Sequence, residues 1–141
     1  MPRLLLFAPC QTALIDAASG NLSLINVVQS VRVPTTPIPL LPVTLVALWR
    51  RSEEEVDAAM TQLVIVRGPD NNEIGRVETQ FIFQRLGHRI INKVGGFQIP
   101  HQGNYEFQLY ITRQGAEYPE QPASSFPLLI QQATPVVAPH T

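Results

Sequence analysis

The clearest pattern along the chain is the alternation of apolar and polar side chains in residues 103–112. One face of this segment carries Tyr105, Phe107, Leu109 and Ile111, and the other carries Glu106, Gln108 and Thr112. A period of two is typical of a β-strand with one buried face and one solvated face. Similar segments, bounded by Gly, Pro and Asn, recur along the chain, so the sequence predicts an all-β protein built mainly from antiparallel strands.

The other predicted strands follow the same logic. They cover residues 4–8, 22–33, 43–50, 61–67, 73–84, 88–94 and 124–132. Within residues 22–33 the apolar positions change phase, which indicates a β-bulge or burial of both faces. Residues 34–42 hold four prolines and are predicted to be an extended crossing between strands, because proline cannot donate a ladder hydrogen bond. For the same reason, Pro127 predicts an edge position, or an outer side, for residues 124–132.

Residues 52–60 carry the one helical signal in the sequence. Ser52 and Glu55 have the spacing of a capping box, and acidic residues in a first turn suit the helix dipole. The segment is too short to form a stable helix alone. We therefore expect a short helix or a charged loop here.

Turn signals every eight to twelve residues or so are typical of two packed antiparallel sheets. Tyr105, two residues after Gly103, has the position of a tyrosine corner, and Trp49 lies on an early strand that suits a core tryptophan. The sequence therefore predicts an immunoglobulin-like or C2-like antiparallel β-sandwich of about seven to nine strands. Its predicted core includes Trp49, Phe81, Phe83, Phe97, Tyr105 and Phe107.

Length and composition narrow the class further. With 141 residues, we expect one domain over residues 1–132 and a flexible, proline-containing tail over 133–141. A net charge of −1 argues against a nucleic-acid binder. The single cysteine, Cys10, cannot form an internal disulfide and is expected to be a small buried residue in a reducing compartment. The first apolar run ends at Pro9, and no run approaches membrane-spanning length, so we expect a cytoplasmic protein without membrane association.

Several segments together resemble a known family. They are residues 6–10, 20–28, 37–40, 97–100 and 103–107. In these segments the chain resembles a family of small uncharacterised bacterial proteins, which are predicted β-sandwiches known only as a domain of unknown function. The resemblance supports the predicted fold and implies a bacterial cytoplasmic origin. It implies no activity and assigns no functional residue.

No catalytic, cofactor-binding or metal-binding residue is predicted. His88, His101 and His140 are far apart and have no Cys or acidic neighbour at ligand spacing, so zinc is not expected. Residues 70–72, an Asp followed by two Asn, are better explained as a turn than as a calcium loop. The sequence has no Gly-x-Ser-x-Gly motif and no phosphate-binding glycine loop.

These features favour a non-catalytic protein-binding or assembly module that acts through loops and exposed strand edges. One alternative is a homo-oligomeric structural protein, associating through the edge that contains Pro127 and through residues 135–137 of the tail. Another is an enzyme whose site is built from loops, with His88 or His101 as acid or base. The proline-rich segment 34–42 and the tail 133–141 are also open as binding elements.

Overall fold

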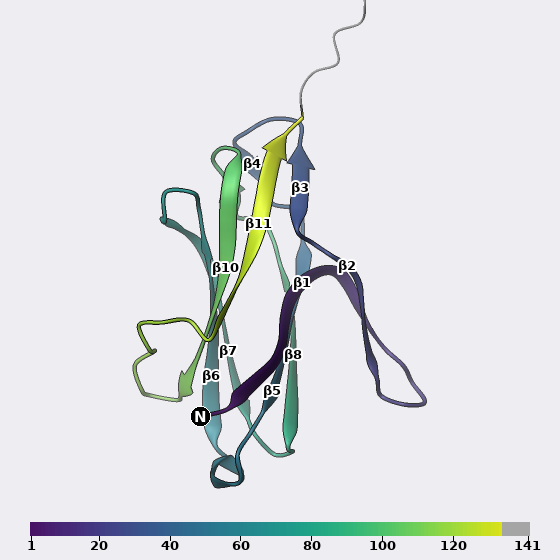
Figure 1. Ribbon diagram of the computed structural model, residues 1–141, viewed down its shortest axis with the longest axis vertical. Coiled ribbons are helices and arrows are strands. Elements are labelled where there is room, and N and C mark those ends of the chain that lie inside the picture. The colour runs from purple at the N-terminus through teal and green to yellow at the C-terminus, as the bar shows by residue number, and fades with distance from the viewer. Residues whose placement is uncertain (134–141) are drawn as a thin grey trace, which may run out of the picture.

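The computed structural model describes residues 1–133 and is all-β, as predicted. Nearly all of the predicted tail therefore lies outside the described residues. A four-stranded sheet has the order β2-β1-β5-β8 and a five-stranded sheet the order β3-β11-β10-β6-β7 (Figure 1). The first comprises β2 (Leu22–Val27), β1 (Arg3–Ile15), β5 (Val43–Arg50) and β8 (Gly87–Val94). The second comprises β3 (Ser30–Val33), β11 (Ser124–Gln132), β10 (Gly103–Arg113), β6 (Ala59–Arg67) and β7 (Glu73–Ile82). A two-residue ribbon, β4 (Ile38–Pro39) with β9 (Gln98–Ile99), completes the strands.

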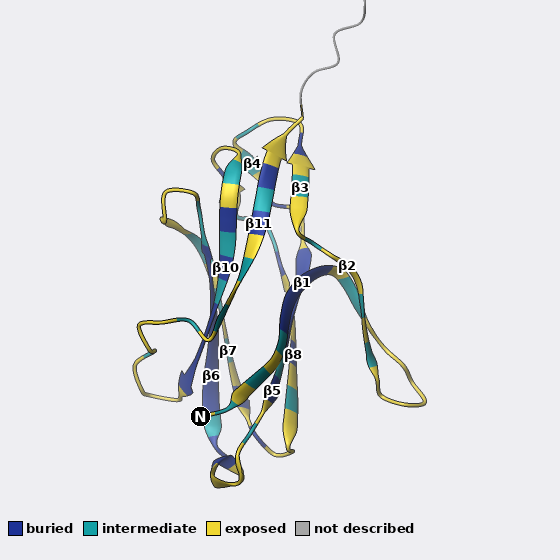
Figure 2. Cartoon of the chain, in the orientation of Figure 1, coloured by how far each residue is buried: buried dark blue, intermediate teal, exposed yellow. Residues whose placement is uncertain are grey.

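The two large sheets face each other across one hydrophobic core. Alternate residues of β5 and β10 point inward, so that Trp49 and Phe107 belong to the same buried cluster. Buried segments are concentrated where the sheets face each other (Figure 2). Of the six predicted core residues, five are buried, and Phe97 is partly buried and packs against the cluster. Cys10 is fully buried, as expected, and burial raises the pKa of its thiol.

The predicted tyrosine corner is confirmed. The Tyr105 hydroxyl donates a hydrogen bond to the backbone oxygen of His101, four residues earlier, and the side chain is buried. This hydrogen bond holds the loop that leads into β10, because it connects the buried Tyr105 side chain, near the start of the strand, to the backbone of that loop.

Three strand predictions need correction. The strand predicted at 4–8 continues through Pro9 to Ile15. The Pro9 oxygen accepts a hydrogen bond from the Val28 N–H, which lies just beyond the end of β2. Proline is tolerated there because its missing N–H falls outside the β1–β2 ladder. The predicted strand 22–33 is two strands in different sheets, so its change of phase marks a crossing rather than a bulge. The predicted crossing 34–42 contains β4, which pairs with β9.

The edge prediction for Pro127 is half right. β11 pairs with β10 along its length and with the parallel strand β3 from Leu129 onward, so β11 as a whole is not an edge strand. Pro127 precedes the β3 pairing and lies on the part of β11 whose second side is unpaired in the described structure. The missing N–H is tolerated there because no neighbouring strand requires it.

Residues 52–60 form one short helical turn followed by a strand. The 3-10 helix η1 covers Glu53–Glu55, and β6 begins at Ala59. The Glu55 carboxylate accepts hydrogen bonds from the Ser52 N–H and hydroxyl, both at 2.8 Å, so the predicted capping pair is confirmed. Within residues 1–133, no helix has the length and apolar character needed to cross a membrane.

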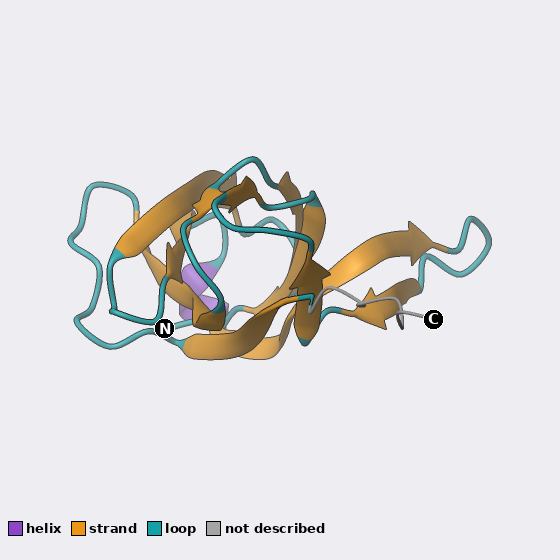
Figure 3. Ribbon diagram, turned by 90° about the horizontal axis from the view of Figure 1, so that it is seen from above, coloured by secondary structure: helices purple, strands orange, loops and turns teal. Residues whose placement is uncertain are grey.

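The hairpin formed by the end of β1 and by β2 extends to one side of the sheets. The view from above shows the sheets around a common interior and this hairpin outside it (Figure 3). We call residues 11–29 the arm. Its turn is closed by two backbone hydrogen bonds of 2.8 Å. The Gly20 N–H donates to the Asp16 carbonyl oxygen, and the Asp16 N–H donates to the Asn21 carbonyl oxygen.

Candidate functional site

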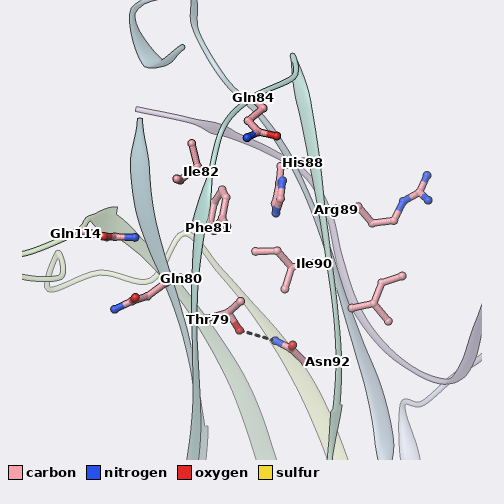
Figure 4. Close-up of a pocket in the computed structure, with 11 residues that line it drawn as sticks. Thr79, Gln80, Phe81, Ile82, Gln84, His88, Arg89, Ile90, Asn92 and Gln114 are labelled. Carbon is pink, nitrogen blue, oxygen red and sulfur yellow. Dashed lines mark hydrogen bonds between the residues drawn. The ribbon is translucent and has the colours of Figure 1, made fainter. Parts of the chain in front are cut away.

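The edges of the two sheets meet at β7 and β8, which are consecutive in the chain. β7 pairs only with β6, and β8 pairs only with β5, in the part of the chain that the structure describes. Each strand therefore has one side of its backbone without a ladder partner. The two strands lie next to each other with an open groove between them, which we call the edge groove (Figure 4).

The edge groove has a volume of about 620 Å³. It is lined by Thr79, Gln80, Phe81, Ile82, Gln84, His88, Arg89, Ile90, Ile91, Asn92 and Gln114. The alternation of β7 and β8 decides which of these side chains form the floor and which form the rim. Inward positions on the two strands form the floor, and outward positions form the rim.

Side-chain contacts connect the two strands across the floor. The His88 ring stacks on Phe81 with ring centroids 4.4 Å apart and an angle of 10° between the planes. His88 also meets Phe83 edge-on, with centroids 6.0 Å apart. Farther along, the Asn92 side-chain amide donates to the Thr79 hydroxyl at 3.0 Å (Figure 4). These contacts hold the two edges together without pairing their backbones.

The rim of the edge groove is apolar and amide-rich. Ile82 and Ile91 are 47% and 39% exposed, although both are large aliphatic residues. Gln80 and Gln84 add amide groups that both donate and accept hydrogen bonds. The Arg89 side chain points away from the groove floor (Figure 4) and donates to the backbone oxygen of Gly20 at 3.0 Å. The groove therefore has no charged group aimed into it from the residues that line it.

His88 is half-buried, and burial lowers the pKa of its imidazole, so the neutral ring is favoured near neutral pH. Within residues 1–133 no hydrogen bond joins this ring to a carboxylate. A general acid or base needs such an orienting partner and access to a substrate, whereas Phe81 covers one face of the ring.

The other histidines do not join His88. His101 lies on an exposed loop, with its ring nitrogen Nδ1 3.1 Å from the Gln102 oxygen, and it is not among the residues that line the edge groove. His140 lies outside the described residues. No group of three or more His, Cys, Asp or Glu within residues 1–133 is placed to hold a metal ion.

The turn interpretation of residues 70–72 is confirmed. The Asn72 side chain donates to the Asp70 carboxylate at 2.7 Å, and Asn71 has a φ of 66°. Asx side chains stabilise turns through such local bonds and tolerate a positive φ.

Reasoning from the sequence did not find the edge groove. Alternation identified the inward residues of both strands, including Phe81, but whether a strand is an edge depends on the order of strands in the sheet. The signal that could have drawn attention is the exposed pair Ile82 and Ile91, which breaks the rule that solvated strand faces are polar.

Comparison with protein families gives a match over most of the chain. The model of a family described as "Family of unknown function (DUF6941)" matches residues 5–117, which run from β1 to the loop after β10. None of the curated proteins matches the chain. The predicted resemblance to an uncharacterised domain family is confirmed.

Proposed function

The chain belongs to the family of unknown function DUF6941, so we propose a function from the geometry of the edge groove itself. We propose that the protein is a non-catalytic binding module that takes up an extended segment of a partner protein. The observation that carries this proposal is the pair of unpaired strand edges, β7 and β8, on either side of a neutral apolar groove.

Backbone hydrogen bonding supplies the affinity in this proposal. An edge strand presents a row of N–H and C=O groups, and an added strand satisfies them while its own side chains alternate between two faces. β7 spans ten residues and β8 spans eight, long enough to bind a peptide of strand length.

Side chains of the groove supply the selectivity. Every second residue of a bound segment would face the floor near Phe81 and Ile90, where apolar side chains fit. The amide groups of Gln80 and Gln84 suit the polar backbone of an extended chain, because an amide satisfies a donor and an acceptor together. We therefore propose a partner segment with alternating apolar residues and few charges.

The test is capture of partners by the tagged protein from a lysate of its source, read by mass spectrometry, with three variants. Ile82→Lys and Ile91→Lys place charges on the rim, and lysine on an edge opposes strand addition. Leu41→Lys is the control, because Leu41 is 75% exposed and does not line the edge groove. We expect a partner that the wild type and the control retain and that both rim variants lose. A partner retained equally by all four proteins would overturn the proposal.

The absence of catalysis is part of this proposal. It is supported by the stacking of Phe81 on His88 and by the separation of His88 from His101 in the structure. Catalytic histidines act in hydrogen-bonded constellations, and neither histidine belongs to one within the described residues.

We also propose the finer features of the fold and location. The tyrosine corner at Tyr105 and the buried Trp49 support an immunoglobulin-like sandwich. The free, buried thiol of Cys10 supports a reducing compartment such as the bacterial cytoplasm.

A further inference from the structure

The arm exposes large apolar side chains on one of its two faces. The register pairs Thr12 with Ile25 and Leu14 with Ser23, so alternation places Leu14, Ile25 and Val27 on one face. These three side chains are 53%, 39% and 44% exposed. The opposite face carries Ile15, which lies in a cleft with Leu5 and Leu48 of the four-stranded sheet.

The arm is almost free of charge. Residues 11–29 contain one charged side chain, Asp16, at the turn. β2 has none, whereas each of the other three outer strands of the two large sheets carries at least one: Glu73, Arg76 and Glu78 on β7, Arg89 and Lys93 on β8, and Arg32 on β3. Charges on edge strands oppose strand addition. On β7 and β8 these charged residues lie outside the edge groove, except for Arg89, which donates to the Gly20 oxygen. β2 is therefore the one uncharged outer strand of the two large sheets that the structure describes.

The arm is also held in place rather than left free. The Arg89 guanidinium donates to the Gly20 oxygen at 3.0 Å, so the turn of the arm is tied to the far edge of its own sheet. The Asn26 side chain donates to the Gln11 side-chain oxygen at 2.6 Å across the hairpin. A preorganised edge loses less conformational entropy when it pairs.

We infer that the occupant of this edge is a second copy of the chain, which pairs its own β2 antiparallel to the first. The two four-stranded sheets would then continue into each other across the arms. In such a pair, a two-fold axis places a central residue opposite its own copy, so a charge there would meet an equal charge. The centre of β2 is Leu24 and Ile25, both apolar, so the edge is complementary to itself. We place Ile25 opposite its own copy, because Ile25 is exposed whereas Leu24 is partly buried.

This inference does not depend on the proposed function, because it uses the opposite edge of the sheet. It also differs from the oligomer predicted from the sequence, which used Pro127 and the tail. The neutrality of β2 favours a second copy over a charged partner, since a charged partner would find no complementary charge there.

The test is the mass of the full chain in solution, by sedimentation equilibrium, for the wild type and two matched variants. Ile25 and Ile91 are both 39% exposed, and both lie on edge strands of the same sheet. We expect the wild type at twice the monomer mass of 15.7 kDa. Ile25→Lys is expected to weaken the dimer by at least about tenfold, because the two lysines face each other. Ile91→Lys is expected to remain dimeric.

A mixture of Ile25→Lys and Ile25→Glu chains provides the rescue. We expect the mixture to regain the dimer mass, because opposite charges then face each other across the axis. A monomeric wild type, equal loss in both lysine variants, or a mixture that stays monomeric would each overturn the inference. Circular dichroism of each variant confirms that it is folded.

The two proposals fail separately. Ile91→Lys should lose the captured partner while keeping the dimer, and Ile25→Lys should do the reverse. Loss of both properties in one variant would show that the surfaces are not independent and would count against the assignment of β2 as the dimer edge.

Discussion

A hydrogen bond across the core offers a direct test of how the two sheets are joined. The Trp49 indole N–H, on β5, donates to the side-chain oxygen of Gln62, on β6, at 2.7 Å. Trp49 is 1% exposed and Gln62 is 2% exposed, so water cannot replace either partner. The substitution Gln62→Met removes the acceptor and keeps an unbranched side chain of similar length.

The expected loss follows from the burial. A buried donor left without a partner destabilises a protein by about 1–3 kcal/mol. For a chain of this size, each kcal/mol lowers the melting temperature by roughly 4 °C, so the fall should be about 4–12 °C. A loss of about 1–3 kcal/mol is a substantial share of a total free energy of unfolding of about 5–15 kcal/mol.

The assay is a double-mutant cycle by urea unfolding with Gln62→Met, Trp49→Phe and the double variant. Circular dichroism is the signal, because Trp49 is the chain's one tryptophan and fluorescence is lost with it. Once both partners are absent, no buried group is left unsatisfied, so the double variant should lose less than the sum of the single losses. Gln80→Met is the control at an exposed position of β7 and should change stability by less than about 0.5 kcal/mol. Additive losses, or a Gln62→Met variant as stable as this control, would refute the reasoning.

Burial lowers the pKa of His88, so the folded state binds this proton less readily than the unfolded state. The stability that the neutral His88 ring contributes is complete above the pKa of histidine in the unfolded chain, about 6.5, and is lost as the pH falls below that pKa. Thermal melts of His88→Gln should therefore show a smaller loss of stability on acidification than those of the wild type. Gly75→Ala should lower stability by about 1–3 kcal/mol in urea unfolding, because the new Cβ would overlap the Phe97 ring; an unchanged midpoint would contradict that packing. Tyr105→Phe removes the bond to the His101 oxygen and should lower stability by about 1 kcal/mol, whereas a neutral effect would remove the corner's structural role.

Strands with local boundaries were predictable from the sequence. The bounds 43–50 and 124–132 agree with β5 and β11, because alternation and the flanking prolines or turns mark their ends within the segment itself. The split of residues 22–33 was not predictable in this way. Val28 and Gln29 continue the mixture of apolar and polar residues of the segment without a turn signal. Only the strand order shows that the chain crosses here from the four-stranded sheet, which contains β2, to the five-stranded sheet, which contains β3.

The edge groove and the Trp49–Gln62 bond both depend on contacts between distant segments. Gln62 is one polar residue in an apolar run, and nothing in the run identifies an indole thirteen residues earlier as its partner. In the same way, the alternation of residues 88–94 indicates a strand but not that its outer side is unpaired. Periodicity reports the face of a strand and not its neighbours.

The arm shows a second reason why composition misleads. Ile25 and Val27 lie in a segment whose apolar pattern indicated a β-bulge or burial of both faces, yet both are exposed. Apolar side chains are found both in a buried core and on an exposed surface that binds another protein, so an apolar segment alone does not distinguish the two. Lack of charge separates a docking edge from a core strand better here, because among the four outer strands of the two large sheets only β2 carries no charged residue within the described structure.

The positions of the arm and the edge groove in one sheet give the two proposals a joint consequence. β2 and β8 are the opposite edges of the four-stranded sheet, so pairing two copies through β2 leaves both β8 edges free. A dimer would then present two edge grooves held at a fixed separation by a continuous sheet. A partner with two extended segments would bind both grooves with a higher effective concentration for the second, and therefore with avidity beyond one groove. Ile25→Lys would remove that gain while leaving the affinity for a single soluble peptide unchanged, because the variant alters the connection between the grooves and neither groove itself.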